Sequence, residues 1–208
     1  MQNPSPFEDR EHVALARAVG ALSAGQVIVY PTETFYGLGV DFSVGGALER
    51  LFAIKAREPG KPVGLIAASV EMAFSVAREV PPAARRLAEK FWPGPLTLIL
   101  PAAPGLPAEL VGPEGDVGVR VSPHRIARAL AAALGRPLTA TSANLAGEPP
   151  ARTIVEARAV FADRVAVYLD GGTMNAAAPS TIVACEGSRM RLLRAGAIDE
   201  TQLFEILK

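Results

Sequence analysis

Two neighbouring cations are the first residues of this sequence whose types and spacing could do chemistry. Lys55 and Arg57 lie in the stretch KAREPGK (55–61), at the expected end of a helix. Lysine offers a point charge and arginine a planar fork, so together they could clamp the oxygens of a polyphosphate. The same cations could instead only favour a helix C-terminus, which is worth about 0.3–1 kcal/mol. The residues alone leave both interpretations open.

A neutral polar run is the second such feature. The stretch PLTATSANLAGEPP (137–150) places Thr141, Ser142 and Asn144 where an apolar segment ends, with no charge before Glu148. A solvent-exposed loop would usually carry charged residues, and a core strand would carry Val or Ile. The run therefore predicts either a wall that holds a ligand or a turn that satisfies its own backbone.

Further hydroxyls and arginines flank other short apolar segments. Thr32 and Thr34 lie in YPTETFYGLG (30–39), and Ser180 lies in APSTIVA (178–184). These hydroxyls could cap turns or could select a small polar ligand. Arg120 stands inside the apolar stretch VGVRV (117–121) and needs an anionic partner if it is buried, either a protein carboxylate or that of a substrate. Arg194 is a further cation beside a glycine turn.

Composition excludes several classes of protein. The 208 residues contain equal numbers of basic and acidic side chains, so no global field attracts nucleic acid. A single cysteine, Cys185, allows neither an internal disulfide nor a cysteine-based zinc site, and no cluster has metal-ligand spacing. The sequence has no GxxxxGK[ST] loop, no GxGxxG motif and no apparent Ser-His-Asp set. Without a signal peptide or a membrane-spanning apolar run, we expect a cytoplasmic protein with no membrane segment.

Alternating helices and strands are expected to position these residues. Apolar periodicity predicts helices at 9–24, 44–56, 70–79, 82–91, 124–135, after the Thr153–Glu156 capping box, and at 199–207. Short apolar runs predict strands at 26–30, 63–68, 96–100, 117–121, 137–141, 165–170, 180–184 and 190–194, with a loop at 31–39. The predicted fold class is α/β, with helices over a mixed sheet, because residues 93–121 and the last strands lack intervening helices. We expect one domain over residues 1–208.

Taken in order, the motifs resemble one family. VIVYPTETFYGLG, KAR, FWPGPLTLIL, VGVRVSPH, TSANLAG, PSTIV and LLRAGAI are similar to the YrdC family of threonylcarbamoyl-AMP synthases, in its short single-domain bacterial form. The resemblance covers about residues 12–198. The family's KxR signature falls on Lys55 and Arg57, and its SxN signature falls on Ser142 and Asn144. It implies an open, twisted α/β sheet with a deep, basic-lined central cavity.

The resemblance also implies an activity and a set of roles. Such enzymes make threonylcarbamoyl-AMP and pyrophosphate from ATP, bicarbonate and L-threonine, and a separate transferase complex then modifies tRNA. By this resemblance Lys55 and Arg57 are catalytic, with Mg²⁺ carried by ATP and no protein nucleophile. The expected ATP-binding residues are Lys55, Arg57, Ser142, Asn144 and Arg194. The expected L-threonine site is Thr32, Thr34, Arg120, Thr141 and Ser180. Weak binding of tRNA is a further expectation.

Two alternatives remain at this point. One is a carbamoyl-adenylate-forming enzyme of the hydrogenase-maturation type, but those proteins are much longer and carry zinc-finger cysteines that one Cys cannot supply. The other is a non-catalytic RNA-binding module, since the family cavity is basic. Zero net charge and only four lysines disfavour that reading.

Overall fold

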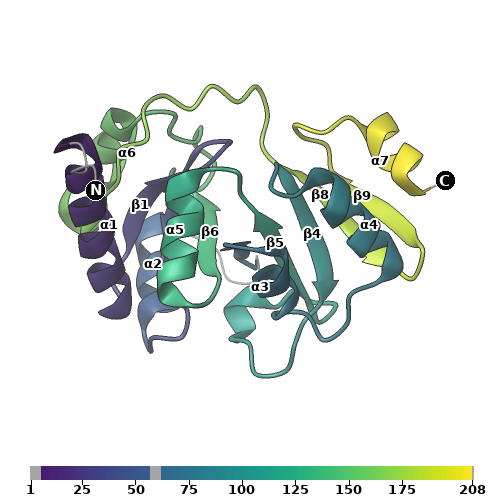
Figure 1. Ribbon diagram of the computed structural model, residues 1–208. Coiled ribbons are helices and arrows are strands. Elements are labelled where there is room, and N and C mark those ends of the chain that lie inside the picture. The colour runs from purple at the N-terminus through teal and green to yellow at the C-terminus, as the bar shows by residue number, and fades with distance from the viewer. Residues whose placement is uncertain (1–5, 57–61, 208) are drawn as a thin grey trace, which may run out of the picture.

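The centre of the fold is a twisted mixed sheet (Figure 1). The computed structural model describes residues 6–56 and 62–207, and in these ranges nine strands pair in the order β7-β1-β2-β6-β3-β5-β4-β8-β9. The strands are β1 (Ile28–Pro31), β2 (Tyr36–Gly39), β3 (Gly64–Ala67), β4 (Leu96–Pro101), β5 (Asp116–Val121), β6 (Leu138–Ser142), β7 (Val167–Tyr168), β8 (Thr181–Glu186) and β9 (Arg189–Arg194). The pairs β1–β7, β3–β5 and β4–β8 are parallel and the others are antiparallel, which confirms the predicted mixed sheet.

Helices cover this sheet as the apolar periodicity predicted. They are α1 (Pro6–Ser23), α2 (Ala47–Lys55), α3 (Val70–Phe74), α4 (Pro82–Phe91), α5 (Arg125–Leu134), α6 (Ile154–Phe161) and α7 (Glu200–Leu207). The capping box of α6 is confirmed, with Thr153 accepting from the backbone of Glu156 and Glu156 accepting in return. Helix α3 is shorter than predicted, and the His124 side chain caps α5.

Strand β2 is a correction, because the sequence predicted a loop over residues 31–39. Tyr36–Gly39 pairs with both β1 and β6. Glycine lowers strand propensity, so Gly37 and Gly39 favoured the loop interpretation. In the structure these glycines make room for the ring of Tyr30 on the paired strand, since a Cβ at position 39 would lie 2.7 Å from Tyr30 Cε1. A side-chain contact between strands therefore overrides the local preference.

Two apolar clusters bury most of the sheet. Helices α1 and α5 pack together over one face, where Ile28, Tyr30 and Ile66 join a smaller cluster. The larger cluster includes α2, α4 and the opposite sides of β1, β3 and β4. Helices α4 and α7 contact each other at the β8–β9 end, away from α1 (Figure 1). No helix within the two described ranges has the length and apolarity needed to cross a membrane.

Small residues leave part of the α1–α5 face open. Side chains of facing residues in paired strands point to the same side of a sheet. The register therefore places Gly64 beside Ala140 and Gly118 beside Ile99 on the face that also carries Arg120. Because glycine and alanine project little or nothing there, this face can be hollow where α1 and α5 do not reach it.

Candidate functional site

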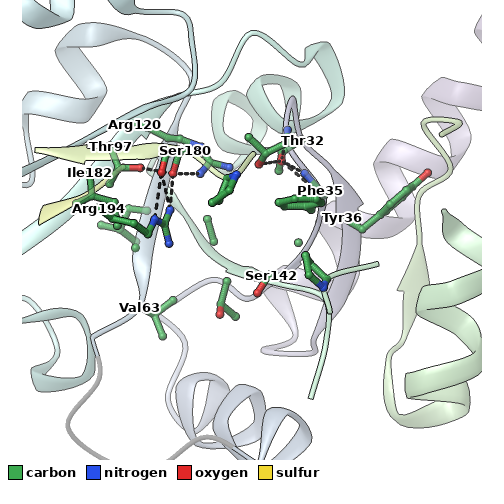
Figure 2. Close-up of a pocket in the computed structure, with 18 of the residues that line it drawn as sticks. Thr32, Phe35, Tyr36, Val63, Thr97, Arg120, Ser142, Ser180, Ile182 and Arg194 are labelled. Carbon is green, nitrogen blue, oxygen red and sulfur yellow. Dashed lines mark hydrogen bonds between the residues drawn. The ribbon is translucent and has the colours of Figure 1, made fainter. Parts of the chain in front are cut away.

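A cavity of about 570 Å³ opens on the sheet (Figure 2). Its walls come from the β1–β2 turn and from strands β2, β3, β4, β5, β6, β8 and β9. Of the predicted site residues, the cavity is lined by Thr32, Thr34, Arg120, Thr141, Ser142, Ser180 and Arg194. Lys55 and Asn144 adjoin it through Ser142, and Arg57 lies outside the described residues. Segments far apart in the sequence thus meet at one site.

One end of the cavity is cationic. Arg120 Nη1 donates to Ser180 Oγ (3.2 Å), and Arg194 Nη2 donates to the same oxygen (3.0 Å) and to Ser180 O (2.7 Å). Figure 2 shows both guanidinium groups converging on Ser180. Burial, and then the charge of Arg120, lower the pKa of Arg194. Two like charges held this close favour an anion between them.

A glycine permits this arrangement. A Cβ at Gly196 would lie 2.4 Å from Pro179 O and 2.6 Å from the nitrogen of Thr181, and neither backbone atom can move aside alone. Only glycine allows the turn after β9 to approach Ser180 this closely. The close approach brings Arg194 onto Ser180, while the ATP-binding role that the family resemblance implies for Arg194 stays a prediction.

Arg120 has a protein carboxylate as a partner. Its Nε lies 3.1 Å from Oε1 of Glu33, and both side chains are almost buried. Ser122 donates its hydroxyl hydrogen to the other oxygen of Glu33. The first of the two alternatives for Arg120 is therefore present, while Nη1 still faces the cavity. No acidic partner is recorded for Arg194 in the part of the chain that the structure describes, so this end keeps a net positive charge.

The two threonine hydroxyls of the β1–β2 turn differ in their hydrogen-bond partners. Thr32 Oγ1 donates to Phe35 O (2.7 Å) and accepts from the nitrogens of Thr34 (3.2 Å) and Phe35 (3.3 Å). One hydrogen and two lone pairs are all that a hydroxyl offers, so the backbone occupies Thr32 fully. Thr34 Oγ1 lies 3.1 Å from Thr32 Oγ1 and has no other recorded contact within the described ranges. Thr34 is therefore the hydroxyl that can meet a ligand.

Lys55 of the KxR signature meets the SxN signature on the β6 side of the cavity. Lys55 ends α2 and is 5% exposed, and its ammonium donates to Ser142 O (2.6 Å) and Asn144 Oδ1 (2.9 Å). Ser142 Oγ donates to the same amide oxygen (2.6 Å). The cation thus braces the loop after β6 at the cavity wall, and the neutral polar run partly satisfies its own turn.

Tyr36 links the cavity to the segment that leads to Ser180. Its ring lines the cavity, while its hydroxyl points away in Figure 2. The hydroxyl donates to Gly172 O (2.8 Å) and accepts from the nitrogen of Gly171 (3.0 Å). Burial is the main cause that raises the pKa of Tyr36 to about 12. Tyr36 is therefore a neutral structural anchor at physiological pH.

Sequence reasoning missed two polar members of the site. Thr97 of β4 lines the cavity and contacts Ser180, and Glu33 holds Arg120. The sequence could have indicated Thr97, because this polar residue interrupts the apolar run LTLIL much as Arg120 interrupts VGVRV. Across residues 6–56 and 62–207, no three His, Cys, Asp or Glu side chains gather as a metal site would require.

Comparisons with known proteins point to one family. Residues 20–196 match the profile of the Sua5/YciO/YrdC family, which carries the description telomere recombination. The threonylcarbamoyl-AMP synthase of Vibrio cholerae is 40% identical over 184 residues, covering 88% of this chain and 97% of the relative.

Solved structures agree with this match. Sua5 of P. abyssi, in complex with L-threonine, superposes with a TM-score of 0.87 at 33% identity over 92% of this chain, which spans 56% of the length of Sua5. E. coli YciO superposes with a TM-score of 0.81 at 28% identity, over 95% of this chain and 93% of YciO. The fold, the ordered motifs and these matches together place the chain in the Sua5/YciO/YrdC family.

Proposed function

We propose that this chain is a threonylcarbamoyl-AMP synthase, which forms threonylcarbamoyl-AMP and pyrophosphate from L-threonine, bicarbonate and ATP. The observation that carries the proposal is the cavity itself. Lys55 of one family signature meets Ser142 and Asn144 of the other at one wall, and a cationic end with hydroxyls forms another. Relatives of this name that align over most of the chain support the assignment.

The signature wall is the proposed ATP site. Lys55, Ser142 and Asn144 form one hydrogen-bonded group at the end of α2 and β6. Arg57 follows Lys55 by two residues, so it would add a planar fork for phosphate oxygens. Magnesium enters with ATP as part of the substrate. We assign binding of the triphosphate to these residues and place the adenylate-forming step beside them.

The opposite end is the proposed L-threonine site. A free amino acid carries both a carboxylate and an ammonium group. Arg120 and Arg194 offer donors and positive charge for the carboxylate, and the Thr34 hydroxyl offers lone pairs to an ammonium or hydroxyl group. Arg194 therefore joins Thr141 among the proposed threonine-binding residues, and Ser180 contributes by holding both arginines in place, whereas the contact of Arg194 with ATP stays a prediction.

The reaction needs placement more than a protein nucleophile. The threonine nitrogen bonds to the carbon of bicarbonate, or of the CO₂ it yields, and a carbamate forms with loss of water or a proton. A carbamate oxygen then attacks the α-phosphorus of ATP, and the bond to pyrophosphate breaks. Holding the two substrates in line and neutralising phosphate charge lower the barrier. Because carbamates decompose in water, a partly enclosed cavity protects this intermediate.

The chemistry of the product indicates which step must follow the proposed reaction. Threonylcarbamoyl-AMP is an activated acyl donor, so a separate transferase complex must accept it for modification of tRNA. We propose that residues 1–208 act as one domain in the cytoplasm, where ATP and tRNA occur together. A purely RNA-binding role is disfavoured, because the chain carries no net charge.

Release of pyrophosphate tests the proposal directly. The full chain is supplied with MgATP, bicarbonate and one amino acid at a time, and pyrophosphate and the acyl-adenylate are both measured. We expect product with L-threonine, and none when bicarbonate is omitted. Lys55→Ala and Arg57→Ala should lower turnover by at least about 10-fold, since each removes a charge-assisted contact of about 1.5–3 kcal/mol. Wild-type turnover in both variants, or no product with any amino acid, would refute the assignment.

A further inference from the structure

We infer that the hydroxyl of Thr97 is a further substrate-contacting group, which donates a hydrogen bond to the carboxylate of the bound amino acid. The inference rests on the proposed function and adds a residue that the predicted site did not contain. Thr97 is the second residue of β4 and lines the cavity. The residue is largely buried, with 9% of its surface exposed. Figure 2 places it beside Ser180 at the cationic end.

The direction of one hydrogen bond follows from the neighbours of Ser180. Its Oγ lies 3.2 Å from Arg120 Nη1, 3.0 Å from Arg194 Nη2 and 3.0 Å from Thr97 Oγ1. Guanidinium groups only donate, so the two arginines occupy both lone pairs of the serine hydroxyl. The hydrogen of Ser180 must then point to Thr97, and Thr97 Oγ1 is the acceptor in that pair.

This leaves the hydroxyl hydrogen of Thr97 without a partner among the residues that the structure describes. The contact with Ser180 is the hydrogen bond recorded for its side chain, and in it Thr97 accepts. The Thr97 methyl group faces β5, where it lies 3.6 Å from the position that a Cβ on Gly118 would occupy. The hydroxyl therefore stands on the cavity side, and its hydrogen is available to an acceptor in the cavity.

The charge around Thr97 identifies that acceptor as an anion. Glu33 offsets the charge of Arg120, whereas Arg194 has no recorded acidic partner in the described ranges. A carboxylate placed here would accept from Arg194, Arg120 and the Thr97 hydroxyl, with four lone pairs to share among them. The group of Lys55, Ser142 and Asn144 lies on the other wall, so the small anion beside Thr97 is assigned to the amino acid rather than to ATP.

The test compares two ligands on three proteins. Dissociation constants of L-threonine and of L-threonine amide, whose neutral carboxamide replaces the carboxylate, are measured by calorimetry without ATP. The proteins are the wild-type chain, Thr97→Val, which keeps the shape, and Thr97→Ser, which keeps the hydroxyl. We expect Thr97→Val to weaken threonine by about 10-fold and the amide by only about 3-fold, because hydrogen bonds to charged groups are roughly twice as strong. Thr97→Ser should stay within about 3-fold of the wild type for both ligands.

The outcomes separate this inference from the proposed function. If Thr97 only orients Ser180, the valine variant weakens both ligands equally, and the inference is overturned. It is also overturned if the serine variant fails to restore the preference for the carboxylate. If the valine variant does not fold, Thr97→Ala carries the same comparison. A wild-type chain that neither binds threonine nor releases pyrophosphate with it refutes the proposed function and this inference together.

Discussion

Replacing Thr32 and Thr34 by valine, one at a time, should affect different properties of the protein. Valine keeps the shape of threonine and removes the hydroxyl. The structure commits the Thr32 hydroxyl to the backbone of the β1–β2 turn and leaves that of Thr34 at the cavity. We therefore expect Thr32→Val to cost stability, and Thr34→Val to cost the choice between threonine and valine as substrates.

The magnitudes follow from the hydrogen bonds that each change removes. Thr32→Val deletes one donated and two accepted bonds with the backbone of Thr34 and Phe35. At about 1 kcal/mol each, the free energy of unfolding should fall by about 2–3 kcal/mol. Thr34→Val removes a hydroxyl whose one neighbour, Thr32 Oγ1, already uses its hydrogen and both lone pairs, so it should lower the free energy of unfolding by less than about 1 kcal/mol. A site that hydrogen-bonds a substrate hydroxyl can reject the analogue lacking it by roughly 10⁴-fold, and Thr34→Val should lose most of that ratio.

Two measurements on each variant check this pair. Urea unfolding gives the change in stability, and pyrophosphate release with threonine and with valine gives the specificity ratio. Weaker discrimination against serine, about 10–200-fold, serves as a reference because it depends on one methyl group. The reasoning is refuted if Thr32→Val leaves stability unchanged, or if Thr34→Val keeps the wild-type ratio of threonine to valine.

Three other changes test the remaining parts of the site. Lys55→Met should raise the KM for ATP by at least about 10-fold while the Kd of threonine stays within about 3-fold, because the lost cation braces the signature wall; equal effects on both substrates would contradict this. Burial lowers the pKa of His124 below its ordinary 6.5, so its contribution to stability is present above pH 6.5 and is lost as pH falls. His124→Asn keeps a capping side chain and should lose less unfolding free energy than the wild type between pH 7 and pH 5 in urea titrations; equal losses would show that the half-buried His124 imidazole does not cause the pH dependence. Gly196→Ala should lower the Tm and raise the KM for threonine, since its Cβ forces the turn that carries Arg194 away from Ser180; an unchanged KM would show that this close approach is dispensable.

Much of the fold could be predicted because its signals are local. The capping box of α6 needs only Thr153 and Glu156, three residues apart, and both sides of it formed as expected. The apolar period of 82–91 gave α4 its observed limits. The mixed sheet followed from strands without helices between them, which cannot all be joined by parallel crossovers. The membership of the family was likewise readable from the order of its motifs along the chain.

Other features depend on contacts between distant segments. Nothing local to Gly37 or Gly39 predicts a strand, because the ring of Tyr30 that occupies their empty side belongs to the neighbouring strand.

The sequence by itself determined which residues could do chemistry, and the tertiary structure decided which of them lie together. Lys55 and Ser142 are 87 residues apart, and their contact exists because α2 ends beside β6. Arg194 contacts Ser180, 14 residues earlier, because Gly196 lets the turn after β9 approach that serine. The direction of a hydroxyl hydrogen is settled last of all, since it depends on how many donors already surround its oxygen. The sequence gives residue types and their spacing, but the number of donors around a hydroxyl oxygen is known only from the folded structure.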